Sequence, residues 1–199
     1  MNKAGEAPAV GLWNPKYAHN VGMVLRLCSC YGFKQLWWSG KRVSLDIKPG
    51  ERLPREERMK GYRNVEMIRS ERFFDMFDRN VTPVAIEVRD NSESLAEFIH
   101  PENALYVFGP EDGSIPSHIL GLCHRFVQIP TAHCLNLATA VSTVMYDRKL
   151  KRIQLGQEPS LPPRDYLNEH RGYVVDGEEV FTGISDDGLG VGHKKRNRL

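Results

Sequence analysis

Short runs of consecutive apolar residues alternate along the chain with stretches in which apolar residues recur every three or four positions. The short runs are typical of buried strands, and the periodic stretches are typical of helices. The predicted strands are Ala9–Trp13, Gln35–Trp38, Val65–Ile68, Pro83–Val88, Ala104–Phe108 and Arg125–Ile129. The predicted helices are Ala18–Tyr31, Phe73–Phe77, a helix capped by Ser92 or Ser94 that ends at Ile99, Ser117–Cys123, and Leu135–Ile153.

This alternation predicts an α/β fold with a mostly parallel sheet covered by helices on both faces. Gly32 stands where a glycine ends a helix in the left-handed conformation. The basic stretch Lys41–Tyr62, which contains Pro and Gly, predicts an irregular loop or insertion. Several prolines follow Gly156. We therefore expect one domain over residues 1–155 and a Pro- and Gly-rich extension over residues 156–199 that ends in a flexible basic tail.

The composition is that of a globular protein outside the membrane, with 41% hydrophobic and 26% charged residues and no apolar stretch long enough for a membrane span. The first residues, MNKAGEAPAVGLW, lack the apolar segment of an export signal, so a cytoplasmic location is expected. The four cysteines are too few for a disulfide framework. A net charge of +2 indicates no partner by itself, but the basic stretch Lys41–Arg72 and the terminal HKKRNRL are suited to contact phosphates.

Ligands of open α/β sheets bind beyond the carboxyl ends of the strands, so the loops that follow the predicted strands are the places to look for chemistry. The chain has no P-loop, and its one run of closely spaced glycines, Gly188–Gly192, follows no predicted strand. Three of these loops carry Asn, Gly and Glu within an apolar frame: NPKYAHNVGMVLR, FGPEDGSIP and IPTAHCLNLATA. Backbone groups and apolar walls of this kind are suited to hold a cofactor.

In order and spacing, the three segments resemble the signature motifs of the SpoU/TrmH branch of the SPOUT RNA methyltransferases. The residues that carry the resemblance are Asn14-Pro15, Asn20, Gly22 and Arg26 in the first segment, Phe108-Gly109-Pro110-Glu111 and Gly113 in the second, and Ile129-Pro130, Leu135-Asn136-Leu137, Ala140 and Tyr146 in the third. Cys134 departs from the family pattern, which usually has Ser at this position.

The resemblance implies a fold in which the C-terminal strand and helix form a trefoil knot that clasps S-adenosylmethionine. It also implies a homodimer in which each subunit helps to complete the site of the other. The expected activity is transfer of a methyl group to a ribose 2′-hydroxyl of RNA, with tRNA favoured over rRNA as the substrate.

By the same resemblance, the catalytic residues are Arg26, Asn20, Glu111 and Asn136, and the cofactor-binding residues are Glu87, Gly109, Ile129, Cys134, Leu135 and Leu137. No metal is expected. A ribose hydroxyl is a weak acid and needs a base or strong polarisation as the new bond forms. Arginine keeps its charge in proteins, so the role of Arg26 is open between a base and an electrostatic stabiliser.

Four other functions are compatible with parts of the pattern. The chain could be an rRNA 2′-O-methyltransferase, a base-methylating relative within the SPOUT family, or a knotted RNA-binding protein without catalysis. A metal-binding or redox module would use Cys123, His124, His133 and Cys134. Adjacent Cys and His side chains point apart in an extended chain, which disfavours the metal site.

Overall fold

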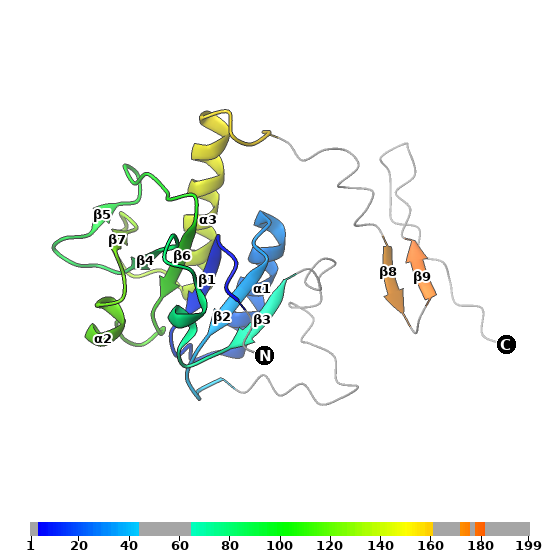
Figure 1. Ribbon diagram of the computed structural model, residues 1–199, viewed down its shortest axis with the longest axis horizontal. Coiled ribbons are helices and arrows are strands. Elements are labelled where there is room, and N and C mark those ends of the chain that lie inside the picture. Colours follow the sequence, from blue (N-terminus) through cyan, green and yellow to red (C-terminus); the bar gives the residue numbers. More distant parts are fainter. Residues whose placement is uncertain (1–3, 44–64, 161–171, 176–177, 182–199) are drawn as a thin grey trace. The chain divides into compact units, whose positions relative to one another are not determined.

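The computed structural model describes residues 4–43, 65–160, 172–175 and 178–181 (Figure 1). The chain divides into two units, Met1–Glu158 and Pro159–Leu199. Most of the predicted loop Lys41–Tyr62 and the whole basic tail lie outside the described residues.

A seven-stranded sheet forms the centre of the first unit. Its strands are β1 (Ala9–Leu12), β2 (Gln35–Trp38), β3 (Glu66–Arg69), β4 (Thr82–Ile86), β5 (Glu93–Ser94), β6 (Ala104–Phe108) and β7 (Arg125–Gln128), in the order β3-β2-β1-β6-β4-β7-β5. Every neighbouring pair is parallel. The predicted parallel α/β sheet is therefore confirmed.

Two long helices, α1 (Ala18–Tyr31) and α3 (Leu137–Gln154), pack against one another and share one apolar core with one face of the sheet. A second core on the other face includes residues of the 3₁₀ helix η2 (Phe73–Met76) and the short helix α2 (Ser117–Leu120). Gly32 ends α1 with a φ of 77°, as its sequence position predicts. Both faces of the sheet are thus covered, which is what its continuous apolar strands require.

The predicted helix that ends at Ile99 is wrong. Residues 93–94 form the short strand β5, which pairs with β7, and turns follow it. The N–H of Leu95 bonds to the carbonyl of Gln128, which extends this pairing by one residue. Here tertiary pairing overrides a local helical pattern, and Leu95 and Phe98 are buried without a helix.

Three other predicted helices are shorter or tighter than expected. The helix predicted over Phe73–Phe77 is a short 3₁₀ helix over Phe73–Met76, and the helix that starts at Ser117 ends at Leu120. The last helix begins at Leu137 because the side chain of Asn136 accepts the free N–H groups of its first turn.

The second unit contains one described element, an antiparallel pair of strands, β8 (Gly172–Val175) and β9 (Glu178–Phe181). The sequence pattern predicted no strand in this part of the chain. None of the helices in the described part of the chain has the length and apolar character that crossing a membrane requires.

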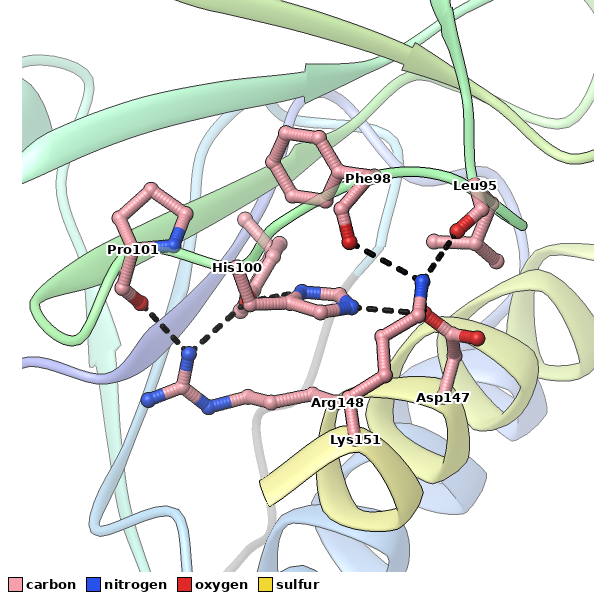
Figure 2. Close-up of polar contacts among 8 residues, drawn as sticks. Leu95, Phe98, His100, Pro101, Asp147, Arg148 and Lys151 are labelled. Carbon is pink, nitrogen blue, oxygen red and sulfur yellow. Dashed lines mark hydrogen bonds and ion pairs between the residues drawn. The ribbon is translucent and has the colours of Figure 1, made fainter. Parts of the chain in front are cut away.

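The C-terminal half of α3 is fixed to the segment that joins β5 to β6 by main-chain carbonyl groups (Figure 2). The buried guanidinium of Arg148 donates to the carbonyl oxygens of Pro101 at 2.6 Å and Glu102 at 2.8 Å. One turn later, the ammonium of Lys151 donates to the carbonyls of Leu95 at 2.6 Å and Phe98 at 3.0 Å. These carbonyls lie outside any helix or strand, and only that of Leu95 also accepts a main-chain N–H, from Phe98, so the two cations satisfy acceptors that the main chain leaves largely unpaired.

A chain of hydrogen bonds continues from Arg148 through a buried histidine. Arg148 donates to the hydroxyl oxygen of Tyr106 at 3.1 Å, and that oxygen lies 2.7 Å from Nδ1 of His100. Nε2 of His100 lies 2.8 Å from a carboxylate oxygen of Asp147. A neutral imidazole fits this chain of hydrogen bonds: Nδ1 of His100 accepts from the hydroxyl of Tyr106, and Nε2 donates to Asp147. Burial lowers the pKa of His100 to about 4, although the hydrogen bond to Asp147 opposes this effect.

This pKa makes the stability of the fold depend on pH. As the pH falls from 6.5 towards 4, the unfolded chain takes up a proton at His100 before the folded chain does, so stability falls across this range. We expect His100 to account for a loss of about 2 kcal/mol in the free energy of unfolding. Urea unfolding at pH about 7 and about 4.5 will measure the loss. It should be smaller in His100→Gln, and an equal loss in both proteins would contradict the assignment.

Candidate active site

Four loops meet at the carboxyl edge of the sheet because all its strands are parallel. The loops after β6, β4 and β7 follow one another along this edge, and the loop after β1 lies next to the loop after β6. The strand order changes direction between β1 and β6, where α/β sheets commonly bind ligands.

Glu111, in the loop after β6, ties that loop to the loop after β1. One oxygen of its carboxylate accepts the backbone N–H of Lys16 at 2.7 Å. The other oxygen accepts Nδ2 of Asn20 at 2.7 Å and the backbone N–H of Tyr17 at 3.3 Å. Three donors therefore converge on one partly buried carboxylate and fix the start of α1.

Asn20 passes this connection on to the loop after β7. Its side chain is only 1% exposed, and its Oδ1 accepts Nδ2 of Asn136 at 3.1 Å. Oδ1 of Asn136 in turn accepts the backbone N–H groups of Ala138 at 2.9 Å and Thr139 at 3.4 Å at the start of α3. The structure thus brings Glu111, Asn20 and Asn136 together in a single chain of hydrogen bonds.

The charge of Glu111 argues against a role in proton transfer. Burial raises its pKa, but the hydrogen bonds from Asn20, Lys16 and Tyr17 outweigh burial, and the pKa lies below its ordinary value. A carboxylate with a lowered pKa is a poor general base near neutral pH. Its three hydrogen bonds instead make Glu111 suited to hold loops in place.

Arg26 does not join this group within the chain. It lies six residues after Asn20 on α1, which places it about 9 Å further along the helix axis and about a third of a turn around it. Its side chain is exposed and makes no hydrogen bond or ion pair with any residue that the structure describes.

Two of the predicted cofactor-binding residues hold the loop after β6. A carboxylate oxygen of Glu87 accepts the backbone N–H of Ile115 at 2.9 Å. A Cβ atom at Gly109 would come within 3.0 Å of the Ile115 side chain and 3.2 Å of its nitrogen. A larger residue at position 109 would therefore push Ile115 away from Glu87.

The other four predicted cofactor-binding residues follow β7 and differ in exposure. Cys134 and Leu135 are exposed, Ile129 is partly buried, and Leu137 is only 6% exposed within the core. The side chain of Leu137 therefore packs inside the fold rather than lining an open surface.

The predicted strand Pro83–Val88 ends early: β4 stops at Ile86, and Val88 lies in the loop after it with 69% of its surface exposed. β4 and β7 are neighbours in the sheet, and the loops that follow them carry the exposed apolar side chains of Val88 and Leu135. The sequence signal for this exposure is that Val88 directly follows the carboxylate residue Glu87 at the end of the predicted strand.

Asp112, beside Glu111, binds two cations, Lys16 and Arg42, and Arg42 belongs to the basic stretch Lys41–Arg72 that the sequence predicts to contact phosphates. Its carboxylate accepts both terminal nitrogens of Arg42 at 2.8 Å, and Nζ of Lys16 lies 3.1 Å from one of its oxygens. These hydrogen bonds, that from Arg42 first, hold the pKa of Asp112 far below its ordinary value. Asp112 is thus charged at neutral pH.

Two cavities lie away from these loops. One of about 310 Å³ includes Tyr31, Gly32 and Glu102 in its wall, and one of about 360 Å³ includes Phe98, Ile99 and Lys151. Neither is lined by a predicted site residue. Within the described residues, no group of three or more His, Cys, Asp or Glu is placed to hold a metal ion.

Comparison with known families identifies the first unit. The model of the SpoU rRNA Methylase family matches residues 7–146, which include the three loop segments and the Glu111–Asn20–Asn136 chain. The chain belongs to this family.

The sequence is similar to that of the tRNA (cytidine-2′-O-)-methyltransferase TrmJ of Methanocaldococcus jannaschii. It is 25% identical over 168 residues, which cover 73% of this chain and 69% of the relative. Among solved structures, the A. aeolicus TrmH/SpoU tRNA modifying enzyme matches with a TM-score of 0.62 and 18% identity, over 84% of this chain and 87% of that one. The SpoU methyltransferase AviRb from Streptomyces viridochromogenes, in complex with AdoMet, matches with a TM-score of 0.58 and 18% identity, over 76% and 63%.

For a member of the SpoU methylase family, the loops after β4, β6 and β7 are chemically suited to hold S-adenosylmethionine. Val88 and Leu135 expose apolar surface, and Gly109 stands where a side chain would crowd Ile115. Backbone groups beside apolar walls are the usual means of binding such a cofactor.

The Glu111→Gln variant tests the hydrogen-bond chain. A glutamine has one acceptor oxygen where Glu111 uses two, so its amide N–H₂ must face one of the three donors. We expect the free energy of unfolding to fall by about 1–3 kcal/mol, measured by urea unfolding. Glu97→Gln, at an exposed position, is the matched control and should change stability by less than about 0.5 kcal/mol. Equal stability of both variants would mean that the three contacts carry no net energy.

Proposed function

We propose that this protein transfers a methyl group from S-adenosylmethionine to a ribose 2′-hydroxyl of tRNA in the cytoplasm. The observation that carries the proposal is the hydrogen-bond chain from Glu111 through Asn20 to Asn136, which joins all three family segments at the carboxyl edge of the sheet. The relation to TrmJ, a tRNA 2′-O-methyltransferase, supports the ribose hydroxyl as the acceptor.

The residues divide into two roles. When bound, S-adenosylmethionine supplies an electrophilic methyl group, so the protein has to position the ribose and favour loss of the hydroxyl proton. Arg26 is free to approach a substrate phosphate or the developing alkoxide, and there its charge stabilises the transition state. Asn20, Glu111 and Asn136 are positioning residues because their polar atoms are occupied by one another and by the helix starts.

Glu87, Gly109, Ile129, Cys134, Leu135 and Leu137 form the cofactor site in this proposal. Glu87 and Leu137 act through the loop and helix that they hold, and Leu135 offers a side-chain surface. Cys134 stands where the family usually has Ser, and it lines the pocket with a weaker hydrogen-bonding group.

The trefoil knot is part of the proposal. Arg148 and Lys151 bind carbonyls of the segment between β5 and β6, so this segment lies against α3. This contact supports the proposal, because a knot requires the C-terminal helix to lie close to an earlier connection.

A homodimer is also proposed, since Arg26 lies away from Glu111 in its own chain. α1 and α3 pack against one another and both carry exposed apolar side chains: Met23 at 43%, about one turn before Arg26 on α1, and Tyr146 at 57% and Leu150 at 37% on α3. A second copy that covers this face would bring Arg26 towards the site of its partner.

The enzyme assay incubates the protein with methyl-labelled S-adenosylmethionine and either total tRNA or total rRNA. Label in tRNA that remains on the ribose after the nucleobases have been cleaved off supports 2′-O-methylation of tRNA. Label in rRNA alone would favour the alternative substrate suggested by the family description. Binding of RNA without any label would indicate a protein that binds without catalysis.

The Arg26→Ala variant should lose methyl transfer by at least about a hundredfold, because the charge that stabilises the transition state is gone. Its affinity for S-adenosylmethionine, measured by calorimetry, should change less than about twofold. Arg79→Ala, at an exposed position before β4, is the control and should retain activity. If Arg26→Ala loses the cofactor instead, its role has been assigned wrongly.

Mixed dimers test whether Arg26 acts on the partner. Arg26→Ala and Glu111→Gln are each expected to be inactive, and a mixture should regain activity only if one intact Arg26 completes the other subunit's intact Glu111 site. Adding Leu150→Glu to both proteins should abolish this recovery by breaking the dimer, which analytical ultracentrifugation will verify. No recovery in a mixture shown to contain mixed dimers would place Arg26 in the site of its own chain.

A further inference from the structure

Two exposed aromatic rings lie at the start of α1. The rings of Tyr17 and His19 are stacked, with centroids 5.4 Å apart and planes inclined by 23°. Tyr17 remains 44% exposed. Its backbone N–H is held by Glu111, so the rings lie beside the hydrogen-bond chain of the active site. An exposed aromatic stack is suited to receive a further flat ring.

Two cations converge beside these rings. Lys16, which follows β1, and Arg42, which follows β2, both bind the same oxygen of Asp112, at 3.1 Å and 2.8 Å. The ammonium of Lys16 also lies 5.2 Å from the centroid of the Tyr17 ring. The side chains of Lys16, Arg42 and Asp112 are 38%, 31% and 45% exposed, so the group can be reached from solvent.

The carboxylate of Asp112 bridges the two cations. A phosphate offers oxygens to the planar fork of arginine in the same bidentate way as a carboxylate. Ion pairs that are this exposed add little to stability, so exchanging one anion for another costs little. Without RNA, Asp112 holds both cations in place.

We propose that the Tyr17–His19 stack and the Lys16–Arg42 pair form a docking site for one unpaired nucleotide of the RNA substrate. The base packs against the rings, and its phosphate replaces Asp112 on the two cations. This inference rests on the proposed function, and it narrows the substrate to a loop or single-stranded segment. In a duplex, the faces of the bases are covered by their neighbours and cannot reach such a stack.

The first experiment measures binding of a labelled short oligouridine and of an RNA duplex of the same length to the full chain. Wild type should bind the single strand more tightly than the duplex. Tyr17→Ala should weaken single-strand binding about tenfold, and Tyr17→Phe should change it less than about twofold. Lys16→Gln and Arg42→Gln should each weaken binding about three- to tenfold and lower the slope of log affinity against log salt by about one.

Arg125→Gln is the matched control. Arg125 makes the same bidentate ion pair, with Glu93, at nearly the same exposure, 35% and 43%, but it lies at the start of β7 and so at the other edge of the sheet. This variant should bind both RNAs like wild type. If it weakens binding as much as Arg42→Gln does, the effect is one of general charge, and the docking site is refuted.

Asp112→Asn separates phosphate exchange from a structural link between loops. Exchange predicts that this variant binds the single strand as tightly as wild type or more tightly, since the competing anion is gone. If the ion pair serves only to join the loops, Asp112→Asn will weaken binding as Arg42→Gln does, and the proposal fails. Thermal unfolding of each variant shows whether it is folded at the assay temperature.

Labelled methyl transfer to total tRNA, run on the same proteins, separates this inference from the proposed function. Wild-type methylation together with unchanged single-strand binding in the Tyr17, Lys16 and Arg42 variants would overturn the docking site alone. The expected binding losses without methylation by wild type would overturn the enzyme function alone. Wild type that neither binds the single strand nor methylates tRNA would overturn both.

Discussion

The contact between Glu111 and Asn20 is the constraint on which the active edge of the sheet depends. The ionised carboxylate of Glu111 accepts hydrogen bonds from three N–H donors. One of these donors, the buried amide of Asn20, also accepts a hydrogen bond from Asn136 at the start of α3. Both long helices begin at this edge, so a single polar chain sets where each of them starts. The loops on either side can then vary in sequence without moving the helices.

Each residue of this chain acts at the end of a helix or strand, where main-chain groups lack partners. Glu111 satisfies N–H groups before α1, and Asn136 satisfies those of α3. Because these donors are bound by side chains from other loops, the local requirement of each helix end is met by tertiary contact. Stability and the geometry of the site are therefore determined by the same few bonds.

The sequence predicted the parallel sheet, the two long helices and the three loops because each rests on local periodicity or on a contiguous motif. It mispredicted the residues near Ser94, where pairing with β7 decides the structure and no local signal records it. It identified Asn20, Glu111 and Asn136 but not their hydrogen bonds, which join residues up to 116 positions apart. Arg26 was identified by motif, and its separation from Glu111 follows from helix geometry that the motif does not express.

The anchoring of α3 has a consequence for how this protein can diverge. Arg148 and Lys151 bind oxygens of the main chain, and every amino acid offers the same oxygen. Most side chains of the segment between β5 and β6 are therefore not needed to hold α3 in place. The exceptions are His100 and the buried Leu95 and Phe98. Exposed positions of this segment, such as Ile99 and Glu97, can change in sequence and form new contacts without loss of the hydrogen bonds that hold α3.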